Sequence, residues 1–174
     1  MPVNVTLECW CEALLPALAE CASDARIGTW LDDFFPHPYT EEDARRYYAA
    51  MRSMSGGLFR AVFEDGALAG CISALRGKGV GCRDLELGYW LNPAFWGRGV
   101  GSAAVCAMCA LAFSQTDAVR IHADVFCANA ASVRLLEKCG FSREGVFARA
   151  AFKNGVFHDV ARYALLKERC ASRE

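Results

Sequence analysis

Three glycines at alternate positions mark the segment of this chain best suited to bind a phosphate. They lie in Trp96-Gly97-Arg98-Gly99-Val100-Gly101-Ser102, between an apolar run that ends near Leu91 and a long stretch of small apolar residues. The glycines free a row of backbone N–H groups, and a helix that begins there adds its positive end. The G-x-G-x-x-G dinucleotide motif is incomplete because position 102 is serine, and the Lys-Ser/Thr pair of a Walker loop is absent. We therefore predict that this loop binds a phosphate-bearing cofactor, although it matches neither of these two nucleotide-binding motifs.

A second segment, Asn129 to Phe141, is typical of an amphipathic helix with an asparagine cap at its start and Gly140 at its end. Together the two segments resemble the Gcn5-related N-acetyltransferases, the GNAT superfamily. In that family an acetyl-CoA loop of pattern Q/R-x-x-G-x-G/A precedes a helix that follows an asparagine and ends in Gly-Phe. The loop aligns with Trp96 to Gly101, with tryptophan in place of the usual Gln or Arg.

The residues around the loop narrow the resemblance to one branch of the family. The stretches Glu86-Leu87-Gly88-Tyr89-Trp90-Leu91 and Phe95-Trp96-Gly97-Arg98-Gly99, with Ser132, are similar to the RimJ/RimL-type branch, which acetylates protein N-termini. The resemblance extends over residues 29–166 and implies a single N-acetyltransferase domain over residues 1–174. It implies acetyl-CoA as donor and a protein N-terminal α-amine as acceptor. The alternatives are a small amine (an antibiotic, polyamine or amino acid) and a non-catalytic acyl-CoA-binding module.

The resemblance assigns acetyl-CoA contacts to the strand before the loop, to the loop and to the start of the next helix. In the family this strand splays from its neighbour, so that unpaired backbone groups receive the pantetheine arm and the thioester oxygen. Arg98 and Ser102 stand where phosphate contacts are expected, and a solvated loop charge is the alternative for Arg98. The predicted cofactor-binding residues are Trp90, Leu91, Trp96, Gly97, Arg98, Gly99, Val100, Gly101, Ser102 and Asn129.

Two polar residues are candidates for the proton transfers of acyl transfer. Glu86 is the candidate general base, acting directly or through water, and an N-terminal amine with a pKa of roughly 7.7–8.0 does not need a strong base. Its alternative is a surface ion pair with an arginine. Many GNAT enzymes protonate the thiolate with a tyrosine where this chain has Leu136, whereas Ser132 resembles the serine proposed for that role in the RimJ/RimL-type branch. The alternative for Ser132 is a helix hydroxyl that binds a free N–H group.

The aromatic segment from Trp30 to Tyr39 is the candidate wall of the acceptor pocket. Phe35, His37 and Tyr39 are the predicted substrate-binding residues. Packing against the sheet is the alternative for the aromatic residues of this segment, which are Trp30, Phe34, Phe35 and Tyr39. The nearby carboxylates Asp32, Asp33, Glu41 and Glu42 suit either a cationic acceptor or the start of a helix.

Composition limits the classes of partner and compartment. The 174 residues, 54% of them hydrophobic, suffice for one domain with a sizeable core. A net charge of −1, from 19 basic and 20 acidic residues, gives no general attraction to nucleic acid or to a membrane, so we expect neither as a partner. The sequence lacks a secretion signal and a membrane-spanning run, so we expect a cytoplasmic monomer or homodimer. The ten cysteines are expected to be reduced, with Cys106 and Cys109 as core residues, and no metal site is expected.

The elements that must position these residues follow from turn signals and periodicity. Strands are predicted over residues 3–8, 59–63, 68–74, 85–91, 119–126, 144–152 and 157–166, and helices over 14–22, 40–53, 99–113 and 129–139. Asp65-Gly66 and Asn154-Gly155 predict hairpins, and Thr40 with Asp43 predicts a capping box. The residues from Lys167 onward are expected to fray. This pattern predicts an α/β domain with a mixed, mostly antiparallel central sheet flanked by helices.

Overall fold

The sheet has seven strands in the order β1-β2-β3-β4-β5-β7-β6, in a computed structural model that describes residues 3–168. Every neighbouring pair is antiparallel except β4 and β5, which are parallel, so the predicted mixed, mostly antiparallel sheet is confirmed. The strands are β1 (Val5–Cys9), β2 (Leu58–Glu64), β3 (Ala67–Arg76), β4 (Asp84–Leu91), β5 (Arg120–Phe126), β6 (Ser142–Lys153) and β7 (Val156–Leu166).

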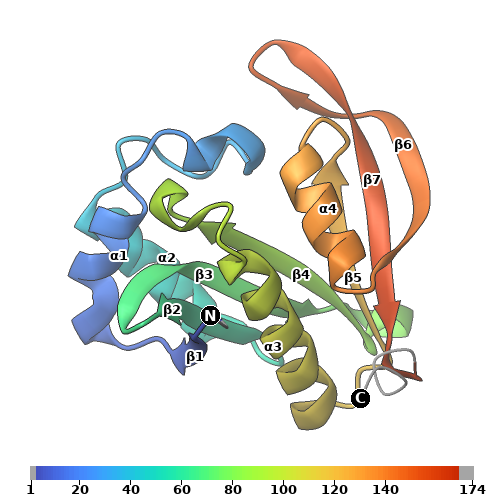
Figure 1. Cartoon of the computed structure of the whole chain (residues 1–174), viewed down its shortest axis with the longest axis horizontal. Coiled ribbons are helices and arrows are strands. Elements are labelled where there is room, and N and C mark those ends of the chain that lie inside the picture. The colour runs from blue at the N-terminus through green and yellow to red at the C-terminus, as the bar shows by residue number, and fades with distance from the viewer. Residues whose placement is uncertain (1–2, 169–174) are drawn as a thin grey trace.

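Four α-helices cover the two faces of this sheet in the described part of the chain. They are α1 (Leu15–Cys21), α2 (Glu41–Ser53), α3 (Val100–Gln115) and α4 (Ala130–Lys138). Figure 1 shows α3 and α4 on one face, with α1 and α2 toward the other. Helix α3 is the crossover that a parallel pair requires, since it connects β4 to β5. Short 3-10 turns that the sequence did not predict lie at Glu12–Leu14, Ile27–Trp30, Gly79–Gly81 and Pro93–Phe95.

The predicted turns and caps have the expected local geometry. Asp65 and Gly66 have φ values of +49° and +81°, and Asn154 and Gly155 have +51° and +79°. Positive φ at both central residues is the signature of the tight turn that joins two antiparallel strands, so both hairpins are confirmed. At the start of α2, the Thr40 hydroxyl accepts from the Asp43 N–H while the Asp43 carboxylate accepts from the Thr40 N–H, which confirms the capping box.

Apolar side chains form two clusters, one on each side of the sheet. The larger lies beneath α3 and α4 and includes Leu85, Met108 and Ile121, and the smaller holds α1 against α2 through Leu15 and Leu18. None of the nine cysteines in the described part of the chain forms a disulfide, and Cys170 lies outside it.

The expectation that Cys106 and Cys109 are both core residues is confirmed for one of them only. Cys109 is buried as predicted, but Cys106 is exposed. The buried stripe of α3 passes through Val105, Met108 and Cys109, and Cys106 lies beside this stripe on the turn of the helix. Small residues along a helix therefore do not by themselves indicate which of two cysteines faces the sheet.

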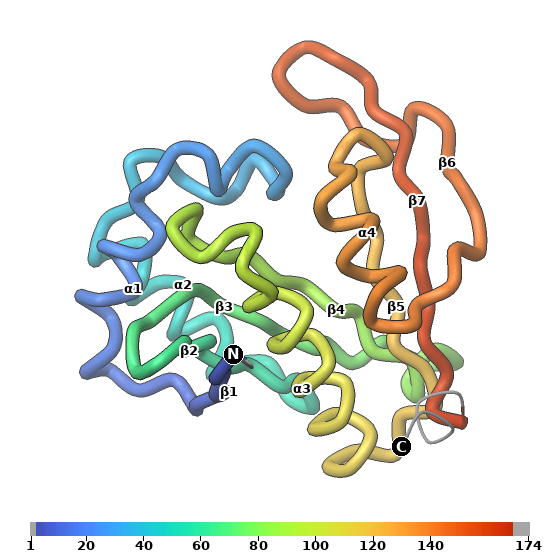
Figure 2. Tube along the Cα trace, viewed as in Figure 1, coloured from blue at the N-terminus to red at the C-terminus, as the bar shows by residue number. Residues whose placement is uncertain are grey.

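The sheet opens between β4 and β5. Seven residue pairs join β3 to β4, whereas the β4–β5 ladder has three, from Asp84–Arg120 to Glu86–His122. Beyond Glu86 the two strands diverge, and Figure 2 shows their traces separating toward the starts of α3 and α4. The predicted splay is confirmed, and it leaves one side of β4 from Leu87 to Leu91 without a strand partner among residues 3–168.

No helix within residues 3–168 is long and apolar enough to cross a membrane. The same residues contain no group of three or more His, Cys, Asp or Glu side chains placed to hold a metal ion.

Candidate active site

The glycine loop places the start of α3, which has no side-chain cap, at the open end of the gap between β4 and β5. Gly97 and Gly99 have φ values of +72° and +88°, which side chains rarely tolerate, and Gly99 is the N-cap residue of α3 without a side-chain hydrogen bond. A Cβ atom at Gly97 would meet nothing within 4 Å, so the space in front of the loop is open. The first-turn N–H groups of α3, from Val100 to Ser102, have no partner within the helix. This arrangement fits a diphosphate.

The side chains of the loop are held by the protein itself. The Trp96 indole N–H donates to the Leu91 carbonyl at 2.8 Å, which ties the loop to the end of β4. Arg98 forms an ion pair with buried Glu64 at 2.8 Å. The Arg98 side chain remains 53% exposed, so its phosphate contact stays a prediction alongside this structural role.

Helix α4 forms the opposite side of the gap. The Asn129 side chain accepts from the Ser132 N–H at 3.1 Å, and Gly140 adopts a φ of +92° at the other end, so both predicted helix signals are confirmed. The two helices pack closely where Gly101 of α3 faces α4. A Cβ atom there would lie 2.6 Å from Leu135 Cδ1, so the third glycine of the loop serves this packing.

A hydrogen bond that the sequence did not predict joins β4 to α4. The hydroxyl of Tyr89 lies 2.6 Å from Ser132 Oγ, and the two residues are 43 positions apart in the sequence. Burial raises the pKa of Tyr89 to about 12, so the phenol is neutral at physiological pH. Sequence reasoning identified Ser132 and excluded a tyrosine at Leu136, but it overlooked the tyrosine on the neighbouring strand.

The two faces of β4 present different chemistry because side chains alternate along a strand. Leu85 and Leu87 are buried on the α3 side, and Tyr89 packs against the same cluster. Glu86 and Trp90 therefore project from the other face, and Trp90 packs against the cluster of α1 and α2. Any contact of Trp90 with a cofactor in the gap would accordingly use its backbone. Glu86 is exposed on the face opposite Tyr89.

A cavity of about 600 Å³ lies on the Glu86 face of β4. It is lined by β3, β4, α2 and the segment before α2. The Phe35 ring is tilted against Tyr39 at 5.1 Å and lies edge-on to Trp90 at 5.7 Å between ring centroids. Most lining residues are aromatic or apolar, namely Leu31, Phe34, Phe35, Pro36, Tyr39, Tyr47, Ala50, Cys71, Gly88, Tyr89 and Trp90, and the polar ones are Asp32, Asp43, Arg46 and Ser73. Glu86 is not itself a lining residue, whereas Gly88, two residues further along the same face of β4, is.

The structure places the three predicted acceptor residues differently. Phe35 and Tyr39 line the cavity, whereas His37 is exposed and lies outside its lining. Tyr39 is buried, as packing against the sheet requires, but the same expectation is wrong for Phe34, which is 93% exposed at the rim. The turn through Asp32 explains this position, since the Asp32 carboxylate accepts from the Phe34 N–H at 3.0 Å and turns the ring outward.

Three of the carboxylates around the start of α2 have cationic partners. The capping box with Thr40 and the Arg46 guanidinium lower the pKa of Asp43, so its charge is satisfied within α2. Asp33 pairs with Lys153 of the β6–β7 hairpin at 2.7 Å, and Glu41 pairs with Arg45 at 2.5 Å. Most of the acidic group expected near the start of α2 is therefore engaged in contacts within the chain.

Glu86 itself has neighbours that are paired elsewhere. Arg120, on the adjacent strand β5, binds Asp84 at 3.0 Å and also Glu144, and His122, opposite Glu86 in the ladder, lies 3.0 Å from Asp84. Among residues 3–168 no ion pair involves Glu86, so the surface pair considered as its alternative does not form. The Glu86 carboxylate is exposed and has no cationic partner in this part of the chain.

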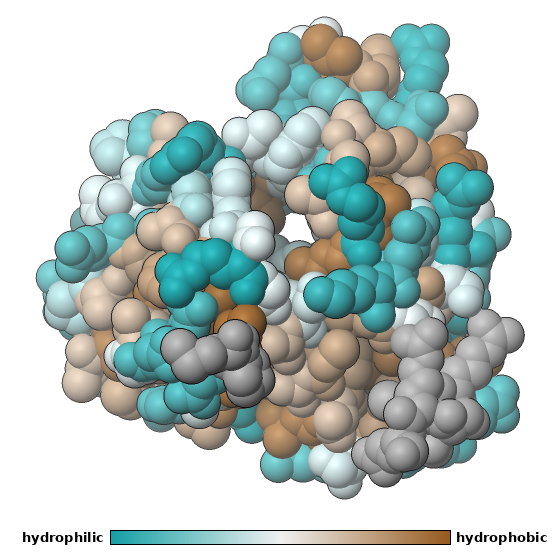
Figure 3. Space-filling view, in the orientation of Figure 1, coloured by the Kyte–Doolittle hydropathy of each residue, from teal (hydrophilic) through white to brown (hydrophobic). Residues whose placement is uncertain are grey.

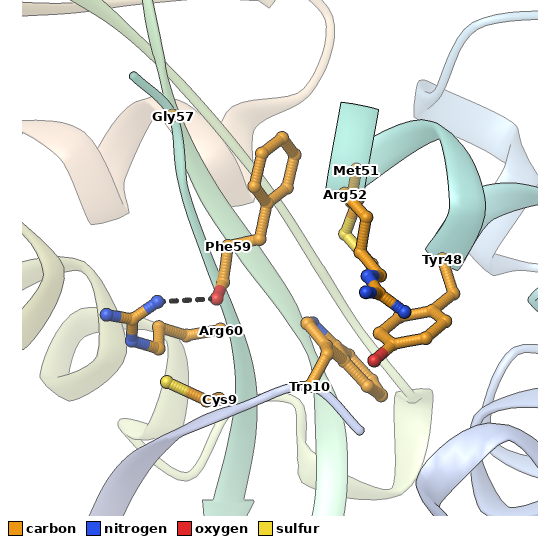
Figure 4. A pocket seen from close by; sticks show the side chains of 8 residues that line it. All are labelled: Cys9, Trp10, Tyr48, Met51, Arg52, Gly57, Phe59 and Arg60. Atoms are coloured by element: carbon orange, nitrogen blue, oxygen red, sulfur yellow. Dashed lines mark hydrogen bonds between the residues drawn. The ribbon is translucent and has the colours of Figure 1, made fainter. Parts of the chain in front are cut away.

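Figure 3 shows a hollow in the molecular surface between α4 and the part of the molecule that contains α1 and α2. A second hollow, of about 420 Å³, is lined by Tyr48 of α2 together with Trp10 and Phe59 (Figure 4). Its arginines are already engaged, since Arg52 lies over the Tyr48 ring and Arg60 donates to the Phe59 carbonyl. None of the predicted site residues lines it.

Comparisons with known proteins agree with this geometry. Residues 4–142 match the family model for the acetyltransferase (GNAT) domain. The chain is 32% identical over 150 residues to "Putative ribosomal N-acetyltransferase YdaF" of Bacillus subtilis (strain 168), covering 82% of this chain and 79% of that protein. RimL, a ribosomal L7/L12 alpha-N-protein acetyltransferase solved with coenzyme A, has the same fold, with a TM-score of 0.83, 24% identity and coverage of 95% and 96%.

A second solved structure of this fold is spermidine N-acetyltransferase from Vibrio cholerae in complex with CoA and spermine. Its TM-score is 0.82 at 21% identity, over 96% of this chain and 98% of that one. The two solved structures share a fold and differ in the amine that their names give. Both were solved with coenzyme A. The chain belongs to the GNAT family of acetyltransferases, as an acyltransferase that uses acetyl-CoA.

Proposed function

We propose that the protein acetylates the N-terminal α-amine of a protein or peptide whose first side chains are apolar. The observation that carries this proposal is the cavity of about 600 Å³ beside Glu86, with its aromatic and apolar lining. An extended chain end that enters it brings its amine to β4 and places an adjoining side chain among Phe35, Tyr39 and Trp90. Burial of such a side chain contributes roughly 1.5–3 kcal/mol, which favours an apolar N-terminus.

The charges at the cavity argue against a polycation as the acceptor. A polyamine or aminoglycoside needs several carboxylates without a cationic partner. Asp43 is bound to Thr40 and Arg46, and Asp33 to Lys153, so Asp32, which accepts from the Phe34 N–H, is the one lining carboxylate without a cation. Arg46 also lines the cavity and repels a second positive charge. A peptide N-terminus carries a single amine, and its reference pKa of roughly 7.7–8.0 leaves a large neutral fraction near pH 8.

The residues divide the chemistry between the two faces of β4. Bound acetyl-CoA supplies an activated thioester. The first turn of α3 would hold its diphosphate, with Trp96, Gly97, Arg98 and Gly99 around it, and the free edge of β4 up to Leu91 would hold the pantetheine arm, with Asn129 across the gap. Glu86, on the cavity face, accepts the proton that the amine loses as its nitrogen bonds to the acetyl carbon. Ser132, on the other side, donates a hydrogen bond to the sulfur as the carbon–sulfur bond breaks. CoA then leaves as a thiolate that takes its proton from solvent.

The test is release of free CoA thiol from acetyl-CoA in the presence of peptides with apolar or charged first residues, polyamines, aminoglycosides and amino acids. We expect peptides with apolar N-termini to give the highest kcat/KM. Turnover of small amines alone would overturn the choice of acceptor while leaving the acetyltransferase intact.

Glu86→Gln tests the base in the same assay. Loss of general base catalysis should lower kcat/KM at pH 7.5 by roughly 100-fold. Glu8→Gln is the matched control, because Glu8 is an exposed strand glutamate on β1 that does not line the cavity. Equal activity of the Glu86 and Glu8 variants would exclude Glu86 as the base.

A further inference from the structure

The hydrogen bond between Tyr89 and Ser132 crosses the gap at a particular place. Tyr89 lies on β4 three residues after Glu86, where the ladder to β5 ends, and Ser132 lies in the first turn of α4. The 2.6 Å contact joins the two sides of the splay beyond the last backbone pair. It therefore lies in the region where the resemblance to the family expects the pantetheine arm and the thioester.

The direction of this hydrogen bond follows from the partners of each group. Among the described residues Ser132 Oγ is the one hydrogen-bond partner of the Tyr89 hydroxyl, which lies in a largely buried site. If Ser132 donated, the phenol proton would have no acceptor, and a buried donor without an acceptor is costly. We infer that Tyr89 donates to Ser132 Oγ. The Ser132 proton must then point away from Tyr89.

Acidity decides whether Tyr89 also gives up its proton. A thiol has a reference pKa of roughly 8.5, whereas burial raises the pKa of Tyr89 to about 12, so proton transfer from the phenol to a thiolate is disfavoured by roughly a thousandfold or more. Tyr89 is therefore unsuited to be the final proton source. A neutral phenol that stays protonated is well suited to hold a neighbouring hydroxyl in one orientation.

We propose that Tyr89 is a positioning residue of the acyl transfer, whose hydroxyl binds Ser132 Oγ and thereby fixes the Ser132 proton toward the departing sulfur. The proposal rests on the role proposed above for Ser132. It replaces the tyrosine that is missing at Leu136 by a tyrosine on β4 that acts through serine. No proton leaves Tyr89, so the residue is neutral before and after each turnover.

The experiment measures kcat and KM for acetyl-CoA in the full chain with Tyr89→Phe, Ser132→Ala and both changes together. Slow hydrolysis of acetyl-CoA without an amine is followed in parallel, because the sulfur departs in that reaction too. We expect Tyr89→Phe to lower kcat by about tenfold and Ser132→Ala by roughly 30-fold, with KM for acetyl-CoA within about twofold. The double variant should be no slower than Ser132→Ala, because Tyr89 acts only through that serine.

Tyr163→Phe is the matched control for a merely structural effect. Tyr163 is a buried tyrosine of β7 whose hydroxyl donates to Glu137 of the same helix α4 at 3.1 Å. It should lose stability like Tyr89→Phe and keep its kcat. Tyr89→Phe with unchanged kcat, effects of the two single changes that multiply, or an equal loss in Tyr163→Phe would overturn the role of Tyr89. Unchanged kcat in Ser132→Ala would instead overturn the role of Ser132, and the inference with it.

Discussion

The two helices that face the gap begin in opposite ways. Helix α3 follows Gly99, whose φ is +88° and which offers no side-chain cap, so the first N–H groups remain open. Helix α4 follows Asn129, whose side chain binds the Ser132 N–H, and Ser132 in turn meets Tyr89. A helix start leaves N–H groups that some acceptor must satisfy. At α3 no side chain caps them, which suits the diphosphate proposed above, and at α4 the Asn129 side chain binds one of them.

The electrostatics of the helix starts support this division of roles. Helix α2 has Glu41, Glu42 and Asp43 in its first turn, which neutralise its positive end within the protein. Neither α3 nor α4 has an acidic residue in its first turn. Both positive ends that border the gap are therefore available to an anionic ligand, and the end that is also uncapped is the one at the glycine loop.

Among the changes that test this comparison, the largest effect is expected from a substitution at Gly99, before the uncapped start of α3. In Gly99→Ala, alanine at positive φ costs about 1 kcal/mol or more, and relief of this strain turns the first N–H groups of α3 away from the gap. We expect the Kd for acetyl-CoA, measured by calorimetry, to rise at least about tenfold, a change of about 1.4 kcal/mol.

Gly66→Ala controls for backbone strain alone. Gly66 has a φ of +81° in the β2–β3 hairpin, and a Cβ atom there would meet nothing within 4 Å. Its stability should fall by a similar amount while acetyl-CoA affinity stays within about twofold. Equal affinities of the two variants would mean that the glycine loop does not hold the diphosphate.

A smaller effect is expected from removing the side-chain cap of α4. Asn129→Ala removes the cap and should lower the free energy of unfolding by about 1 kcal/mol. Because the first turn of α4 then frays, Ser132 is held less firmly and kcat should fall about fivefold, which corresponds to about 1 kcal/mol.

Thr40→Ala removes the equivalent cap of α2, a helix that lines the acceptor cavity and does not border the gap between β4 and β5. Urea unfolding should show a comparable loss of stability in both variants, and only Asn129→Ala should slow the hydrolysis of acetyl-CoA measured without an amine. A similar loss of this hydrolysis in Thr40→Ala would show that general destabilisation explains the effect.

The features that the sequence predicted correctly depend on local backbone geometry, and those that it missed are contacts between residues far apart in the sequence. The glycine loop, the Asn129 cap and the two hairpins depend on backbone geometry that neighbouring residues determine, and all appear as expected. The Tyr89–Ser132 bond joins residues 43 positions apart and depends on how far β4 and β5 diverge.

The ion pair of Arg98 is a further contact of this kind. Its partner Glu64 lies on β2, far from the loop in sequence. Charge type and local spacing carry no information about which buried carboxylate a loop arginine will reach. The roles of the individual site residues remain predictions, since sequence pattern and side-chain placement identify candidates that only activity can test.

The smallest expected effect concerns how stability and turnover depend on pH through Tyr89, the partner of Ser132 at the capped start of α4. Burial raises the pKa of Tyr89 to about 12, above the unfolded value of roughly 10. A raised folded pKa stabilises the protein fully below the unfolded pKa, and this contribution is lost as pH rises from about 10 to 12. Urea unfolding at pH 8, 10 and 11 should therefore show the wild type losing more stability above pH 10 than Tyr89→Phe does.

For turnover of a peptide amine, the rate should rise through roughly pH 8 as the amine becomes neutral and then stay level to about pH 10. Tyr89→Phe should show the same profile at a lower plateau. A loss of activity between pH 8 and 10 in the wild type alone would show that Tyr89 ionises during turnover, and that the phenol supplies a proton where the structure favours an orienting hydrogen bond.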